Sequence, residues 1–147
     1  MNTIYENLVK ACPTFLDELK LRCIENVYDP IAFGNSFTVL KNDELRFRII
    51  RDRGQIFGEI APPFDPDNWS DLDEVLRTMG FEPERAIRKW ELEEEREELD
   101  NLCHLVVVNY EHLVSMFSKS NFQATKHTLE NLQNIRAKRL FGENFSG

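Results

Sequence analysis

The stretch LRFRIIRDRGQIFGEI, residues Leu45–Ile60, decides the fold of this chain. Before its turn, apolar and charged residues alternate with a period of two. This predicts a strand whose apolar side chains face inward while Arg46 and Arg48 face outward. The Asp-Arg-Gly sequence that follows predicts a tight turn, because its glycine, Gly54, readily takes a positive φ angle. The alternation then resumes, so we predict an antiparallel β-hairpin at the centre of the chain.

Working outward, the same pattern predicts an α+β domain around this hairpin. Residues 22–30 and 35–42 also have strand-like alternation, which extends the hairpin to an antiparallel meander of three to four strands. Residues 4–19 have apolar side chains at helical spacing, interrupted by Pro13, and predict two short N-terminal helices. Residues 70–79 begin with a capping box and predict a further amphipathic helix.

The remainder of the chain predicts C-terminal helices. Pro83 suits a first helical position, and apolar periodicity recurs over residues 99–117 and again over 129–140. The last two helices predict a helical hairpin. We therefore divide the chain into residues 1–82, an α+β domain with an antiparallel sheet, and residues 83–147, a helical extension that packs as one unit with it.

Length and composition limit the class of protein. The 147 residues suit one domain with an extension, and a hydrophobic share of 41% supplies a core. The net charge of −8 repels free nucleic acid and attracts basic partners. We expect no direct binding of nucleic acid.

Cysteine usage and apolar runs predict the compartment. The three cysteines are odd in number and lack CxxC spacing, so neither a disulfide framework nor a zinc knuckle is indicated. Free thiols are typical of a reducing compartment. The longest apolar run, LVVV at residues 105–108, is too short to span a bilayer. We expect a cytoplasmic protein that does not insert into a membrane.

Arginines form the first candidate site. The central stretch contains Arg46, Arg48, Arg51 and Arg53. If helices cover only one face of the sheet, arginines on the other face, flanked by Thr38 and Glu59, are available to a carboxylate-bearing or phosphate-bearing partner. Alternatively, the arginines pair across strands with Glu44, Asp52 or Glu59 and only support the sheet.

An acidic segment forms the second candidate site. Residues 91–100, ELEEEREELD, contain seven acids and one arginine. A helix this polar either projects into water or meets a basic surface. In the binding hypothesis, four of its acids contact cationic residues of a partner: Glu93, Glu94, Glu97 and Glu98. Trp69 and the arginines Arg46, Arg48 and Arg53 then shape the contact.

Signatures of catalysis are missing from the sequence. No GxSxG, GxGxxG or GxxxxGK[ST] motif occurs. Asp100 and His104 are spaced to supply two metal ligands, but no second pair completes a site. We expect no catalytic residue, no metal centre and no cofactor. An enzyme that holds an anionic substrate on the arginine face, with Asp52 or Glu59 as base, is an alternative that requires a pocket.

Two segments resemble a known family. They are FGNSFTVLKNDELRFRIIRDRGQIFGEI, residues 33–60, and WSDLDEVLRTMG, residues 69–80. The alternating hairpin with a DRGQ turn and the tryptophan-led helix resemble small bacterial immunity-type proteins of polymorphic and contact-dependent toxin systems. The resemblance covers the middle third of the chain, and residues 83–141 lie outside it. It implies a small acidic α+β protein, without catalytic residues, that occludes the active site or substrate groove of one toxin.

Together these observations predict a non-enzymatic protein-binding module, an immunity-type inhibitor that occludes a basic partner such as a nuclease toxin. The alternative is an intracellular regulatory or scaffold protein that forms a homodimer through its C-terminal helices. Salt distinguishes the two, because a charge-steered complex weakens with salt and a hydrophobic helical interface does not.

Overall fold

The structure, a computed structural model, describes residues 2–32, 34–82 and 92–141, except for the side chains of residues 92–94, 140 and 141. It has the predicted α+β architecture, with helices before and after an antiparallel sheet. The helices are α1 (Ile4–Ala11), α2 (Phe15–Leu19), α3 (Leu72–Thr78), α4 (Leu92–Val108), α5 (Tyr110–Met116) and α6 (Phe122–Phe141). The predicted helical start at Pro83 lies outside the described residues.

The sheet is a meander in which each strand pairs with its neighbours in sequence. The strands are β1 (Arg22–Asp29), β2 (Asn35–Lys41), β3 (Arg46–Asp52), β4 (Gln55–Ala61) and β5 (Ser70–Asp71). The four long strands are the predicted meander, and β5 adds a two-residue pairing at the β4 edge. Arg53 and Gly54, between β3 and β4, have φ angles of 52° and 77°. Two positive φ angles in a two-residue loop match the twist of a tight hairpin.

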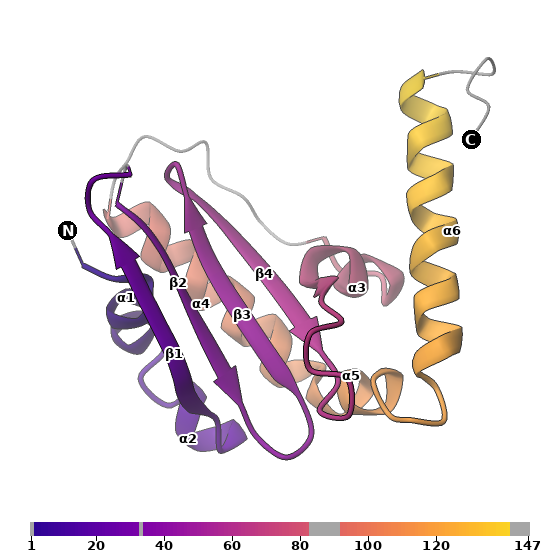
Figure 1. Ribbon diagram of the computed structural model, residues 1–147, viewed down its shortest axis with the longest axis horizontal. Coiled ribbons are helices and arrows are strands. Elements are labelled where there is room, and N and C mark those ends of the chain that lie inside the picture. The colour runs from indigo at the N-terminus through magenta and orange to yellow at the C-terminus, as the bar shows by residue number, and fades with distance from the viewer. Residues whose placement is uncertain (1, 33, 83–91, 142–147) are drawn as a thin grey trace.

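Helices cover one face of this sheet. Figure 1 shows α1, α2 and α4 behind the sheet, with α3 beside β4 and α6 beyond α3. The predicted inward side chains on and beside β3 face these helices, since Leu45, Phe47 and Ile49 are all at most 5% exposed. Burial of such side chains is the main term that stabilises the layer.

A glycine allows the helices to approach β4 closely. Gly58 faces the helical layer, and a Cβ atom built there would lie 3.1 Å from Leu72 of α3 and 3.3 Å from Leu102 of α4. The absence of a side chain at this position therefore lets two helices pack over the same strand.

The core joins the two predicted segments of the chain. One hydrophobic cluster contains buried residues from Ile4 in α1 to Leu129 in α6. The Cys12 thiol donates to the carbonyl oxygen of Leu99 in α4 at 3.5 Å, and the amide of Ile4 donates to Ser36 Oγ at 3.1 Å. The N-terminal helix is thereby held to both the sheet and α4.

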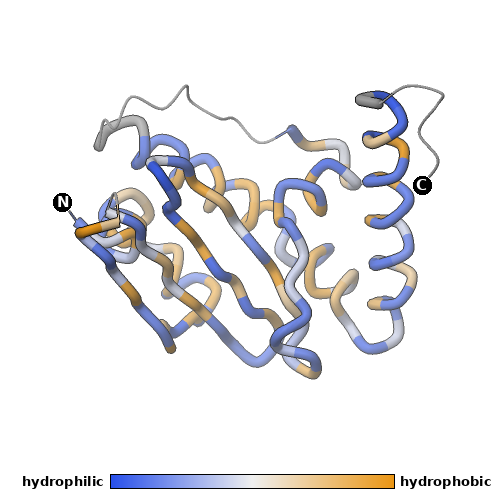
Figure 2. The backbone as a smooth tube through the Cα atoms, turned by 45° about the horizontal axis from the view of Figure 1, so that its top comes forward, coloured by the Kyte–Doolittle hydropathy of each residue, from blue (hydrophilic) through white to orange (hydrophobic). Residues whose placement is uncertain are grey.

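Helix α4 runs obliquely behind the sheet toward α5, and α6 turns steeply away from it on the far side of α3 (Figure 1). Helix α6 packs against α3, where the buried carboxylate of Glu74 forms ion pairs with Arg136 and with Arg77. Figure 2 shows α6 as a mainly hydrophilic helix with few hydrophobic positions. No helix in the described part of the chain has the length and apolarity needed to cross a membrane.

Candidate functional site

The sheet has one face that no helix of the described residues covers (Figure 1). Strand pairing determines which side chains lie on it, because residues that are directly opposite in neighbouring strands share a face. We call the outward side chains of β1 to β4 the open face. Arg46 and Arg48 lie on this face, as the alternation predicts.

An apolar row crosses the open face. Its four residues are consecutive cross-strand partners: Val27, Phe37, Ile50 and Phe57. Val27 is 42% exposed and Phe57 is 43% exposed, while the two central side chains are partly buried between them. Four large apolar side chains therefore lie side by side across the sheet, with no described element covering them.

A tryptophan and an ion pair lie beside this row. Arg48 Nε donates to Glu59 Oε1 at 2.6 Å, across strands β3 and β4. The Arg48 guanidinium carbon lies 4.5 Å from the centre of the Trp69 ring, and that of Arg46 lies 5.6 Å away. The half-buried Trp69 ring therefore stacks over both arginines, which holds them in place through cation–π attraction.

Cross-strand pairing of the arginines is confirmed at Glu59 alone. Within the described residues Asp52 forms no ion pair, and Glu44 instead accepts a hydrogen bond from Tyr110 Oη at 2.8 Å. Thr38 was predicted to flank the arginine face, and this is wrong. It is fully buried on the covered face, where its hydroxyl donates to the carbonyl oxygen of Glu25 at 3.0 Å.

Cations form a second row on the open face. Arg22, Lys41 and Arg46 are consecutive partners across β1, β2 and β3. Their side chains form no ion pair and no hydrogen bond with any described residue. Like charges directly opposite each other destabilise a sheet, so this basic row is unfavourable for folding.

The other two arginines lie elsewhere. Arg53 is exposed in the turn after β3, where its amide donates to Asn35 Oδ1 at 2.8 Å. Arg51 has the same parity as Phe47 and Ile49 and faces the helices. The predicted group of arginines is therefore split between the open face, a turn and the core.

Arg51 forms a buried ion pair with the acidic segment. Its Nη2 lies 2.8 Å from Glu95 Oε1, its Nε lies 3.1 Å from the same oxygen, and its Nη1 donates to the carbonyl oxygen of Gly34 at 3.0 Å. Both side chains are at most 10% exposed. The guanidinium thus satisfies the Glu95 carboxylate inside the core, as a buried charge requires.

Two acids of the acidic segment are therefore buried, whereas composition predicts that they are solvated. Glu95 and Glu98 are 7% and 5% exposed, so the prediction that Glu98 meets a partner conflicts with its burial. Glu97 is exposed, and the side chains of Glu93 and Glu94 lie outside the described part of the structure. Helix α4 covers the far side of the sheet from Arg46, Arg48 and Trp69, so these acids and the open face do not form one surface (Figure 1).

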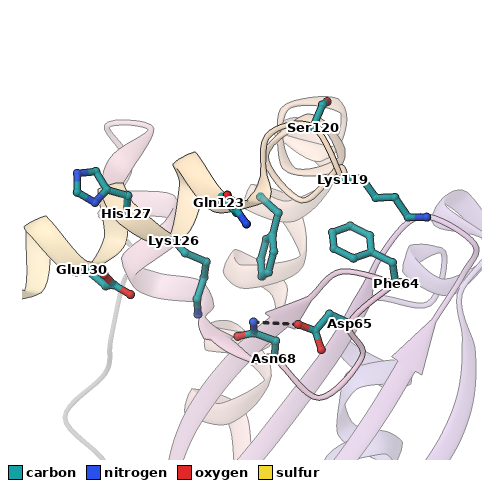
Figure 3. Close-up of a pocket in the computed structure, with 10 residues that line it drawn as sticks. Phe64, Asp65, Asn68, Lys119, Ser120, Gln123, Lys126, His127 and Glu130 are labelled. Carbon is teal, nitrogen blue, oxygen red and sulfur yellow. Dashed lines mark hydrogen bonds between the residues drawn. The ribbon is translucent and has the colours of Figure 1, made fainter.

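A cleft of about 590 Å³ lies between the loop after β4 and the start of α6 (Figure 3). Phe64 packs edge-on against Phe122 with ring centres 5.6 Å apart. Polar side chains that line the cleft form hydrogen bonds with other residues of the protein. Asn68 donates to Asp65 at 3.1 Å, and Lys126 donates to Ser70 at 3.1 Å. These contacts fix the loop that leads into Trp69, and Arg46, Arg48 and Glu59 do not line this cleft.

Two titratable groups outside the open face, Tyr110 and Cys103, have raised pKa values that favour their neutral forms. Burial, together with the hydrogen bond to Glu44, raises the pKa of Tyr110 to about 12. Burial is also the main cause that raises the pKa of the Cys103 thiol, and the nearby Cys12 thiol adds to it. Among the residues with described side chains, no group of three or more His, Cys, Asp or Glu is placed to hold a metal ion.

Sequence analysis missed the apolar row. Its signal is the pairing of two adjacent apolar residues within a strand, at Ile49–Ile50 and at Ile56–Phe57. One residue of each pair faces the core, so the other must face outward. Strict alternation would have placed a polar residue there.

Comparisons with protein-family models, with curated proteins and with solved structures found no match to this chain. The case for a function therefore depends on the geometry of the open face.

Proposed function

We propose that this protein is a non-enzymatic protein-binding module whose partner docks on the open face of the sheet. The observation that carries the proposal is the apolar row of Val27, Phe37, Ile50 and Phe57, which crosses four strands with its two end residues exposed and its two central residues partly exposed. Antiparallel sheets with one face in water normally alternate apolar and polar residues, with polar side chains on the wet face. A contiguous apolar patch on such a face is typical of an interaction site.

The surroundings of the row support a protein partner. Protein interfaces combine an apolar centre with a charged rim, and tryptophan and arginine are frequent at their strongest contacts. Here Trp69, Arg48 and Glu59 border the apolar row on one side. Asp29 and Asp52 border it on the other side, because they occupy the adjacent outward positions of β1 and β3.

Within this class, we propose an immunity-type inhibitor of a basic protein, such as a nuclease toxin. The net charge of −8 supports a basic partner, since it accelerates the encounter through the field of the whole protein. Because α4 lies on the covered side of the sheet, Glu97 acts through this long-range field, while the open face makes the contact. In this proposal the inhibitor acts by covering its partner, and no residue of the open face performs chemistry.

The alternative of self-association through the C-terminal helices has less support. An interface between helices needs an apolar stripe at helical spacing. Among the described side chains of α4, α5 and α6, the large apolar ones that are exposed are Val108 and Ile135, which lie on different helices and form no stripe. A second copy of the chain would find a larger apolar surface on the open face than on α6.

The experiment compares two substitutions of exposed apolar residues. Phe57→Asp places a charge in the apolar row, and Val108→Asp places the same charge on α4, where Val108 is 60% exposed. The partner is captured from a lysate of the native host, purified, and titrated against both variants by calorimetry. We expect Phe57→Asp to weaken binding about 30-fold or more, the loss typical of a central interface residue.

Val108→Asp should bind like the unmodified protein. Equal affinity of Phe57→Asp and the unmodified protein would exclude the open face as the docking site. Recovery of the protein alone, as an oligomer that resists salt, would favour the self-associating scaffold instead.

A further inference from the structure

Resting on docking at the open face, we infer that the basic row is a subsite for the carboxylates of an acidic segment in the partner. The basic row consists of Arg22, Lys41 and Arg46, with Trp69 stacked over the last of these. A basic toxin can carry such a segment, because net charge does not describe the local distribution of charge. In this inference the acidic segment of the partner binds at the end of the open face where Arg22, Lys41 and Arg46 lie.

The first argument is the cost of the basic row. Three cations lie directly opposite one another on adjacent strands, in a chain whose acids outnumber its basic residues by 26 to 18. Among the described residues no carboxylate forms an ion pair with these three side chains, although Asp43 and Glu44 line the same surface hollow as Arg22 and Lys41. Arrangements that oppose folding and lack a paired counter-charge are typical of functional sites. Carboxylates supplied by a partner would remove the repulsion.

The second argument is the preparation of Arg46. Its guanidinium carbon lies 5.6 Å from the centre of the Trp69 ring, and no described carboxylate forms an ion pair with it. Arginine presents a planar set of donors that matches the two oxygens of a carboxylate. An arginine that is already oriented loses little conformational freedom when it binds, which favours binding.

The third argument is position. The basic row lies four residues along β4 from the apolar row, because Ala61 is opposite Arg46 and Phe57 is opposite Ile50. Four strand residues span about 13 Å. One extended segment of four or five residues would therefore reach from an apolar anchor on Phe57 to the basic row.

Acids between the two rows favour a protein segment over a nucleic acid. Glu25, Glu59 and Asp71 lie in the row next to the basic row. A polyphosphate chain that crossed the sheet would pass these carboxylates and meet the overall charge of −8. A partner with carboxylates at one end of the segment and apolar side chains at the other avoids this repulsion.

The test uses the fluorescence of Trp69. Trp90→Phe leaves Trp69 as the single tryptophan. A capped hexaglutamate peptide and a single-stranded oligothymidine of equal charge are titrated separately at low ionic strength. The same titrations are made with Lys41→Gln and Arg46→Gln, which remove charges from the basic row. Lys10→Gln, on the exposed side of α1 behind the sheet, is the matched control.

We expect hexaglutamate to change the Trp69 emission saturably, and added salt to reverse the change. Each basic-row variant should weaken this binding about fivefold, the upper range for an exposed ion pair, while Lys10→Gln leaves it unchanged. Tighter binding of oligothymidine than of hexaglutamate would overturn the inference in favour of nucleic acid. A flat hexaglutamate titration, or equal effects of all three substitutions, would overturn it outright.

The result is separable from that of the docking experiment. If Phe57→Asp abolishes partner binding and hexaglutamate does not bind, the subsite is wrong and the docking face stands. If hexaglutamate binds at the basic row and Phe57→Asp leaves partner binding unchanged, the row is an anion site and the docking face is wrong.

Discussion

Arg51 of β3 and Glu95 of α4, separated by 44 positions in the chain, form an ion pair inside the core with Nη2 and Oε1 2.8 Å apart. The pair joins the sheet to the helix that covers it. Because the Arg51 side chain is 1% exposed, neither charge can be removed alone without leaving the other unpaired away from water.

Arg51→Met should therefore reduce the free energy of unfolding by about 3–5 kcal/mol, since it leaves the Glu95 carboxylate uncompensated. The double variant Arg51→Met/Glu95→Leu should recover most of this loss, because apolar side chains of similar size replace both charges. Urea denaturation of the variants measures the effect. Arg48→Met is the control at the partly exposed pair with Glu59, where we expect a loss of about 1 kcal/mol. A double variant as unstable as Arg51→Met would contradict this account.

Gly58→Ala should destabilise the protein by about 1–3 kcal/mol, because the added methyl group meets the buried side chains of Leu72 and Leu102. Leu72→Val removes the terminal methyl that lies closest to it. The loss of stability in the double variant should then be smaller than the sum of the losses in the two single variants, by about 0.5 kcal/mol or more. Thermal denaturation of all four proteins provides the cycle, and strict additivity would show that the contact with Leu72 is not the cause.

The raised pKa of Tyr110 predicts that the protein loses stability at high pH. Its pKa is about 12 in the folded state against 10.0 without its surroundings, because burial and the bond to Glu44 favour the neutral phenol. A raised pKa contributes stability that is complete below pH 10 and is lost as the pH rises toward 12. Stability measured across this range should fall less steeply in Tyr110→Phe than in the unmodified protein. Parallel curves for the two proteins would rule out this contribution.

Neutralising the centre of the basic row should stabilise the fold. Lys41→Thr removes repulsion with both Arg22 and Arg46 and introduces a residue that favours strands. We expect a gain of about 0.2–1 kcal/mol at low salt, which shrinks as salt screens the charges. Denaturation at two ionic strengths measures this gain. A loss of stability at both would mean that Lys41 makes favourable contacts that outweigh the repulsion.

Much of the architecture follows from local sequence. The period of two around Phe47 and Ile49, the turn at Gly54 and the capping residue Asp71 each determine structure through neighbours in the chain. The predicted capping box begins at Ser70, but the residue that caps α3 is the next one, Asp71, which accepts from the amide of Asp73 at 2.8 Å. The meander needs no further information, because each long strand pairs with the next one in sequence.

The remaining features depend on contacts between distant residues. Composition alone predicts that residues 91–100 form a solvated acidic helix. It cannot show that Glu95 pairs with Arg51, which lies on the covered face of the sheet. The parity of Arg51 with Phe47 was an available sign that one arginine faces the core. Likewise, the match of Val27 with Phe57 across four strands emerges only once the register is set.

The meander and the helix α4 also differ in how soon they can form. Hairpins close short loops and cost little chain entropy, whereas the contact of Cys12 with Leu99 spans 87 positions. We expect the strands to pair early and α4 to dock late in folding. Before α4 docks, the Arg51 guanidinium lacks the Glu95 carboxylate with which it pairs in the folded protein. The ion pair between Arg51 and Glu95 therefore forms late in folding, when α4 docks on the sheet. A chain released before residue 95 has been synthesised cannot complete its core.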